Sequence, residues 1–156
     1  MNKYIGTKLI EAEPMTKKDF LVKEKNKTKE ELHNEDDMHG YKVKYSDQYI
    51  SWSPKNMFEK AYMKIITNAN LKSDISISQE MVDNFIKETH INTIGDKTTL
   101  VRAVLRNGFE IVEASACIDK ENYDEKVGSE ICMDKIKDKV WYLLGFLLQT
   151  AKNGIN

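Results

Sequence analysis

The residues best suited to binding chemistry lie on a predicted β-hairpin that spans residues 98–118. Arg102 and Arg106 carry planar guanidinium groups, which bind phosphate oxygens in pairs. Phe109 carries an aromatic ring that can stack on a nucleobase, with a gain of ~1–3 kcal/mol. This combination predicts a platform for a ligand with a flat ring and phosphates. The alternative is a solvated face on which Arg102 and Glu113 form a cross-strand pair worth ~0.2–1 kcal/mol.

The hairpin turn is predicted at Asn107-Gly108, because Asn-Gly between alternating strands favours a two-residue type I′ turn. A two-residue loop would set the register and put Arg102 opposite Glu113. The other predicted facing pairs are Arg106–Phe109, Val104–Ile111 and Leu100–Ser115. The opposite face would then be the core face, and its expected residues are Val101, Ala103, Leu105, Val112, Ala114 and Ala116.

A long helix is predicted from Asp124 to Lys152, after a loop at residues 119–123. Lys135 and Lys139 lie four residues apart on one flank of it, where two ammonium groups repel unless an anion lies between them. The alternative is that both lysines form local ion pairs with neighbouring aspartates. The buried stripe of this helix is predicted as Cys132, Ile136, Val140, Leu143 and Leu147.

The stretch V-W-Y-L-L-G-F-L-L, residues 140–148, is apolar nearly all round. It is too short to cross a bilayer, which takes ~20 helical residues. A helix that is apolar on all sides must be covered on several of them. Since a chain of 156 residues has little core to cover it, we expect a homo-oligomer, a dimer or a larger assembly such as a hexamer.

The rest of the sequence predicts an α+β fold with two domains, residues 1–66 and 76–156. The first would be a small β-rich module ending in a short helix, and the second a helix, the hairpin and the long helix packed on it. Thr16, Ser53 and Ser78 are suited to cap helices, the last of them over residues 79–89. The charged segment 26–40 is expected to be an exposed linker.

Composition narrows the function classes. The formal net charge is −1, which argues against broad attraction to nucleic acid or to membranes. The two cysteines and three histidines show no metal-ligand spacing, and no glycine-rich phosphate loop occurs. We therefore expect a cytoplasmic protein that is not an enzyme and needs no cofactor.

Four ordered motifs, L-R-N-G-F-E-I, E-A-S-A-C-I-D, N-Y-D-E-K-V-G and K-V-W-Y-L-L-G-F-L-L, resemble a small uncharacterised phage-protein domain over residues 76–152. The front part, with Y-I-G-T-K-L-I-E-A-E-P-M-T and G-Y-K-V-K-Y-S-D-Q-Y-I-S-W-S-P, resembles another short phage module. The second domain is also similar to the phage anti-Thoeris sponge proteins. Those proteins are oligomers that sequester a cyclic ADP-ribose isomer, and some also bind cyclic di- or trinucleotides.

The resemblance implies a ligand site between protomers, built from the hairpin and the long helix. Phe109 would stack on a base, and Ser115 and Asn122 would form hydrogen bonds to ribose or base. Lys135 and Lys139 would meet the pyrophosphate. Arg102 and Arg106 are not part of the family's own motif, in which the strand ends in N-G-F, and rest on the hairpin pattern alone.

Three alternatives stay open at this point. The apolar C-terminal helix could serve a protein-interaction module that binds a host protein. A hydrolase of cyclic nucleotides would need metal-dependent turnover, and a DNA-binding phage regulator would show salt-sensitive retention on DNA.

Overall fold

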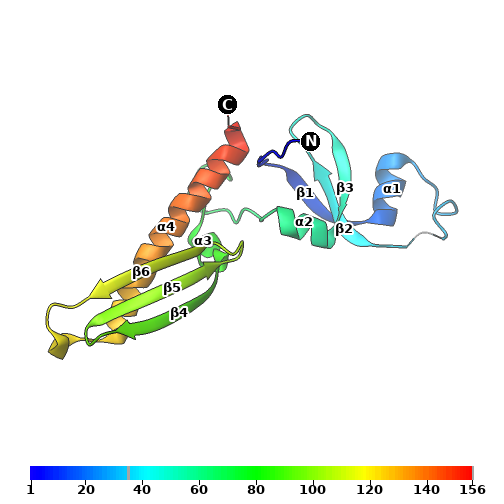
Figure 1. Ribbon diagram of the computed structural model, residues 1–156. Helices are drawn as coiled ribbons and strands as arrows, with labels where there is room; N and C mark the ends of the chain where they lie inside the picture. The colour runs from blue at the N-terminus through cyan, green and yellow to red at the C-terminus, as the bar shows by residue number, and fades with distance from the viewer. Residues whose placement is uncertain (35, 156) are drawn as a thin grey trace. The chain divides into compact units, whose positions relative to one another are not determined.

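The computed structural model describes residues 1–34 and 36–155. The chain forms two compact units, one from Met1 to Lys64 with the residues from Ala151 onward, and one from Ile65 to Thr150. Each unit holds a three-stranded antiparallel sheet, and a long helix runs to the C-terminal end (Figure 1). The predicted α+β class is confirmed.

The first unit builds its sheet in the order β1-β2-β3. Its elements are β1 (Glu11–Thr16), α1 (Lys17–Lys25), β2 (His39–Lys44), β3 (Ile50–Pro54) and α2 (Lys55–Ala61). Val43 of β2 is 1% exposed, and the ring of Tyr41 stacks on Phe58 of α2 with centroids 4.1 Å apart. The alternation of residues in β2 therefore places the face with Tyr41 against α2, whereas Lys42 on the opposite face pairs with Glu24 of α1.

Of the two helix caps predicted for this unit, one is confirmed and the other is wrong. Thr16 caps α1 as predicted, since its hydroxyl accepts a hydrogen bond from the Asp19 amide at 3.2 Å. The predicted Ser53 cap of α2 is wrong: Pro54 stands at the cap and no side chain accepts a bond there. The cause is that Ser53 is still paired with Tyr41 as part of β3.

The described residues of the segment 26–40 are exposed, as its charge predicts, except for Leu32 and Gly40. Leu32 is buried at 6% exposure. Thr28 and Glu31 form reciprocal hydrogen bonds, with the Thr28 amide donating to the Glu31 carboxylate at 2.8 Å. These two contacts order the turn that carries Leu32 inward, so the expected exposed linker contributes to the core. Position 35 of this segment lies outside the described residues.

The second unit contains a strand that the sequence analysis missed. Its elements are α3 (Gln79–Phe85), β4 (Ile86–Ile94), β5 (Thr98–Leu105), β6 (Glu110–Ala116), a single 3₁₀ turn (Lys120–Asn122) and α4 (Glu125–Asn153). The helix predicted for residues 79–89 ends at Phe85, and the chain continues directly as β4. Nearly every residue of β4 is exposed, so no alternation of apolar and polar residues marks it as a strand.

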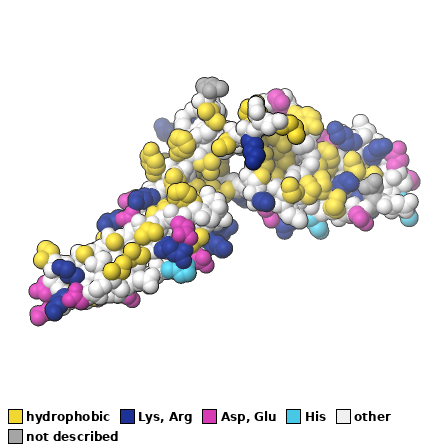
Figure 2. All heavy atoms as spheres, in the orientation of Figure 1, with side chains coloured by type: hydrophobic (Ala, Val, Ile, Leu, Met, Phe, Trp, Pro, Cys, Tyr) yellow, Lys and Arg dark blue, Asp and Glu magenta, His cyan; other side chains and the backbone are white. Residues whose placement is uncertain are grey.

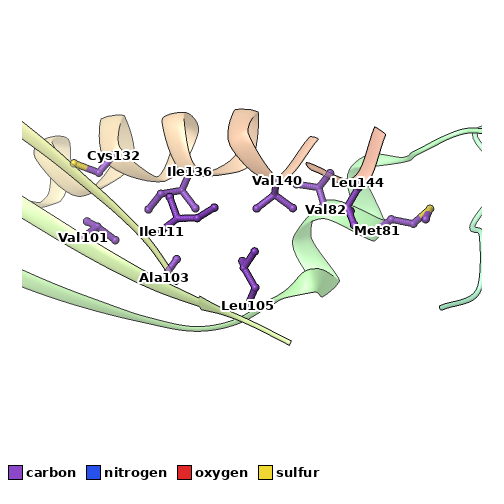
Figure 3. Close-up of a cluster of buried hydrophobic side chains, with 10 residues drawn as sticks. All are labelled: Met81, Val82, Val101, Ala103, Leu105, Ile111, Cys132, Ile136, Val140 and Leu144. Carbon is purple, nitrogen blue, oxygen red and sulfur yellow. The ribbon is translucent and has the colours of Figure 1, made fainter. Parts of the chain in front are cut away.

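The core of the second unit lies between one face of the sheet and α4, as Figure 3 shows. The buried residues are Met81, Val82, Val101, Ala103, Leu105, Ile111, Cys132, Ile136, Val140 and Leu144. The predicted stripe of α4 is confirmed up to Val140 and then changes: Leu144 is 1% exposed and Leu147 is 40% exposed. The buried positions stay four residues apart along the whole contact with the sheet. Because an α-helix has 3.6 residues per turn, such positions do not lie directly above one another, and the buried stripe winds slowly around the helix. Among the described helices, none has both the length and the apolar composition needed to cross a bilayer.

Candidate functional site

The hairpin turn has three residues rather than the predicted two. The Leu105 amide donates to the Phe109 carbonyl at 2.8 Å, and the Gly108 amide donates back to the Leu105 carbonyl at 2.9 Å. Gly108 has φ +84°, and Asn107 has no positive φ. A type I′ turn needs two residues with positive φ, whereas a three-residue loop with glycine in the left-handed position needs one. The predicted turn is therefore wrong.

The longer loop shifts the register by one residue, which turns β6 over. Arg102 lies opposite Val112, and Val101 lies opposite Glu113. Glu113 and Ser115 thus share the core-facing side with Val101, and Val112 lies on the outer side at 51% exposure. Since side chains alternate with a period of two, one residue of slip is enough to exchange the two faces of a strand.

The two arginines of the expected platform are engaged elsewhere. Arg102 is on the sheet face away from α4, where its Nη1 contacts the Glu110 carboxylate at 2.7 Å. Arg106 donates from Nε to the carbonyl of Asn84 and from its amide to the carbonyl of Phe85 at 3.0 Å. Arg106 therefore satisfies carbonyls at the end of α3, which helix termini leave without partners. The expectation that both arginines share a face with Phe109 is wrong.

Phe109 instead faces the long helix across a hollow. The hollow has a volume of about 510 Å³ and is lined by Phe109, Glu110, Ile111, Val112, Asp138, Lys139, Tyr142 and Leu143. Phe109 is 56% exposed and Tyr142 is 77% exposed. Figure 2 shows hydrophobic side chains at the surface along α4, with lysine and arginine side chains beside them. The hollow thus offers two ring faces and one ammonium group to a ligand.

The two lysines predicted as phosphate ligands both reach toward β6. Lys139 forms an ion pair with Glu113, whose side chain is only 15% exposed. Lys135 donates to the carbonyl of Ala114 at 3.4 Å, which is a long contact. Each ammonium group has three N–H donors, so donors remain for a further acceptor.

Ser115 and Asn122 come together in a second, smaller hollow of about 140 Å³. Its wall also includes Lys97, Thr99 and Tyr123. Within one chain, the predicted hydrogen-bonding residues are therefore separated from the predicted stacking residue. Phe109 and Lys139 share the larger hollow, and Ser115 and Asn122 share the smaller one.

The motif N-Y-D-E-K-V-G receives a structural explanation. The Tyr123 hydroxyl is within 3.0 Å of the Thr99 hydroxyl and 2.7 Å of the Thr93 hydroxyl, which ties β4 and β5 to the start of α4. The Asp124 carboxylate accepts hydrogen bonds from two amides in the first turn of α4, the nearer at 2.8 Å. A Cβ on Gly128 would lie 2.2 Å from the Thr99 hydroxyl oxygen. This motif seats the helix on the sheet.

Sequence reasoning did not single out Tyr142 as a site residue. Its position three residues after Lys139 is the signal that was available, because such residues are neighbours on a helix surface. Tyr142 was instead interpreted as part of the apolar run 140–148. Only the packing of α4 against β6 distinguishes Tyr142, which is exposed, from Leu144, which is buried.

The second unit is similar to a known protein family. Residues 77–152 match the model of the Phage protein (N4 Gp49/phage Sf6 gene 66) family. No curated protein and no solved structure matches the chain. The matched range covers α3, the second sheet and nearly all of α4, and so contains both hollows. The second unit therefore matches a phage-protein domain, which supports that part of the resemblance seen in the sequence.

Proposed function

We propose that this protein is a phage anti-defence protein that binds a cyclic nucleotide immune signal and holds it without cleaving it. The preferred ligand class is a cyclic ADP-ribose isomer, with cyclic oligonucleotides as further candidates, in the cytosol of the host cell. Support comes from the phage-protein domain over residues 77–152 and from the resemblance of its motifs to anti-Thoeris sponge proteins. Sequestration lowers the free signal available to an immune effector by mass action.

The observation that carries the proposal is the hollow between Phe109 and Tyr142, with Lys139 on its wall. Its volume of about 510 Å³ falls in the range of small-molecule sites, about 300–1,000 Å³. A base stacked on one of the two rings would gain ~1–3 kcal/mol. Lys139 and Lys135 lie on the same flank of α4, so a pyrophosphate can meet both ammonium groups.

The acidic residues near the hollow have distinct roles in this proposal. Glu113 is mostly buried and fixes the Lys139 ammonium group, so the cation is positioned before a ligand arrives. Glu110 and Asp138 lie on the wall of the hollow, where carboxylates accept hydrogen bonds from ribose hydroxyls. The same carboxylates repel a phosphate, which directs the phosphates toward the lysine flank.

The test is to incubate purified full-length protein with a panel of cyclic nucleotides and cyclic ADP-ribose isomers. Unbound material is removed, the protein is heat-denatured, and the released compounds are identified by mass spectrometry. We expect one compound to be retained and released intact. A chemically altered product would mean turnover and would refute sequestration, and the absence of any retained compound would refute binding.

Two variants locate the site. Phe109→Ala should weaken binding of the retained compound by about 5- to 150-fold, the equivalent of losing ~1–3 kcal/mol of stacking. Ile91→Ala is the matched control from the same sheet, because Ile91 is exposed on β4 and lines neither hollow, and the affinity of this variant should stay within about twofold of wild type. Equal losses from both variants would place the ligand outside the hollow.

The second candidate function is a protein-interaction module that binds a host protein through α4. The exposed rings of Tyr142 (77%) and Phe146 (67%) favour it, because large apolar surface patches mark interaction sites. A chain that is monomeric, retains no nucleotide and loses a host partner upon Phe146→Ser would support this alternative.

A further inference from the structure

The first unit holds a hollow of its own, at the end of the sheet where β1 stops, β2 starts and the helices α1 and α2 begin. Its volume of about 440 Å³ falls in the range of small-molecule sites, about 300–1,000 Å³. The lining residues are Pro14, Met15, Thr16, Asp19, His39, Gly40, Tyr41 and Lys55. None of them lies within residues 77–152 or lines a hollow of the second unit.

Four of these residues share one face of the sheet. β1 and β2 pair antiparallel with Pro14 opposite Tyr41 and Thr16 opposite His39. Directly opposite residues point to the same side of a sheet, and so do residues two apart along a strand. The register of the two strands therefore groups these side chains at the hollow.

Contacts on both sides of the sheet fix this floor before a ligand arrives. On the far face, the Trp52 indole covers Gly40 so closely that no Cβ would fit there. The same indole donates from Nε1 to the Met15 carbonyl at 2.9 Å. On the near face, the Tyr41 ring stacks on Phe58 with centroids 4.1 Å apart. A preformed site loses less conformational entropy when it binds.

The start of α1 contributes little to this hollow as an anion site, because its main-chain donors are in use. The Lys17 amide donates to the Met38 carbonyl at 2.9 Å. The Asp19 amide donates to the Thr16 hydroxyl at 3.2 Å. The charged side chains on the wall therefore decide which ligand the hollow can hold.

These side chains carry opposite charges and come from different helices. Within the described part of the chain, the carboxylate of Asp19 and the ring of His39 have no bonded partner, and no third metal ligand joins them. The Lys55 ammonium group is 4.0 Å from the Glu59 carboxylate, a long and exposed contact that contributes little. Asp19 and Lys55 form no ion pair with each other, so both charges are available to a ligand.

We propose that this hollow binds a free α-amino acid with an apolar side chain. The amino acid carries an ammonium group, which donates to Asp19, and a carboxylate, which accepts from Lys55. Its side chain lies against the sheet face of Pro14 and Tyr41. A ligand with a single charge would be attracted by one of the two groups and repelled by the other, so a zwitterion is favoured.

Analogues of one amino acid test the ligand class on the unaltered full-length protein. Leucine, methionine and phenylalanine are titrated at millimolar concentration into ¹⁵N-labelled protein, and amide chemical shifts are followed by NMR. We expect leucine to shift amides of residues 15–19 and 39–41 and to leave those of residues 77–152 unchanged. The absence of such shifts with all three amino acids would overturn the proposal.

Blocking either charge of leucine separates the two contacts. N-acetyl-leucine lacks the ammonium group and leucine amide lacks the carboxylate, and each should bind about tenfold more weakly than leucine. These analogues also represent the two ends of a peptide. If leucine amide binds as tightly as leucine, the hollow takes a peptide amino terminus; if N-acetyl-leucine does, it takes a carboxyl terminus. Either result would overturn the free amino acid.

Two substitutions assign each charge to its partner. Asp19→Asn should weaken leucine about tenfold and leave N-acetyl-leucine unchanged, because that analogue has no ammonium group to lose. Lys55→Gln should do the same for leucine and leave leucine amide unchanged. Lys60→Gln is the matched control, because Lys60 lies in α2 outside the hollow. Equal losses for leucine and its blocked analogue would overturn the assignment.

This site and the proposed function fail independently. A protein that retains a cyclic nucleotide but shows no amide shifts with the amino acids would refute the site and leave the function standing. A protein that binds leucine at the first unit and retains none of the cyclic nucleotides would support the site and refute the function.

Discussion

The contact between Gly128 and Thr99 allows one substitution to be worked through quantitatively. Gly128 lies in the first turn of α4, and a Cβ built there would be 2.2 Å from the hydroxyl oxygen of Thr99 and 2.7 Å from its Cβ. Thr99 is fully buried, and its hydroxyl is bonded to Tyr123 at 3.0 Å. Because the Thr99 Cβ is attached directly to the backbone, no side-chain rotation relieves the clash. Gly128→Ala must move α4 away from β5.

The expected loss follows from two opposing terms. Overpacking a close-packed core costs ~1–3 kcal/mol, and a clash with a backbone-attached atom belongs to the upper part of that range. Replacing glycine by alanine in a helix returns up to ~1 kcal/mol. The net change is a loss of ~1–2 kcal/mol of unfolding free energy. For a unit of this size the melting temperature should fall by about 5–15 °C.

Thermal unfolding followed by circular dichroism at 222 nm measures this change. Gly145→Ala is the internal control, because it lies in the same helix and a Cβ there would meet no atom within 4 Å. We expect Gly145→Ala to be stabilising by up to ~1 kcal/mol. If Gly128→Ala melts at or above the wild-type temperature, α4 does not pack on Thr99 as closely as the structure shows.

Four further substitutions test the packing of the two units. Leu144→Ala should lower the free energy of unfolding by ~2–5 kcal/mol because Leu144 is buried, whereas Leu147→Ala should lower it by ~1 kcal/mol or less. If urea unfolding gives the larger loss for Leu147→Ala, the helix face assigned to the core is wrong. The hydrogen bond from Lys137 holds the pKa of Asp83 below its usual value, so its stabilising effect is present above the unfolded-state pKa of ~3.9 and is lost as the pH falls through the lower folded-state pKa. Asp83→Asn should therefore lower stability by ~0.2–1 kcal/mol at pH 7 and have no effect near pH 2, and a constant difference in urea unfolding across that range would contradict the pair. Trp52→Phe removes a 2.9 Å hydrogen bond to a main-chain carbonyl of β1 and should lower the free energy of unfolding of the first unit by ~0.5–1.5 kcal/mol. Urea unfolding followed by near-ultraviolet circular dichroism measures this loss, and an unchanged unfolding midpoint would mean that water replaces the bond.

The candidate site shows which features can be predicted from local sequence patterns. The pairing of Lys135 and Lys139 on one flank of α4 was predictable, because helix geometry fixes side-chain spacing along the chain. The engagement of Arg106 with the Asn84 carbonyl was not, since it depends on where α3 ends relative to the hairpin. The hollow between Phe109 and Tyr142 requires the docking of α4 on β6, which no local pattern encodes.

The sequence by itself determined the features that depend on local backbone chemistry. The caps at Thr16 and Ser78 are of this kind, because a hydroxyl reaches an amide three residues along the chain. So is the turn near Asn107-Gly108, where glycine accepts a positive φ. The motifs that mark the phage-protein domain are also readable from the residues alone.

Only the tertiary structure decided the hairpin register, the presence of β4 and the identity of the exposed rings. A two-residue and a three-residue loop differ little in local energy, yet they place opposite faces of β6 on the core. The choice is made by burial: Ile111 packs under α4 at 5% exposure, whereas the alternative register would have buried Val112. Contacts with α4 therefore settle what the turn residues leave undecided, because Ile111 packs in the core and the mostly buried Glu113 pairs with Lys139 of that helix.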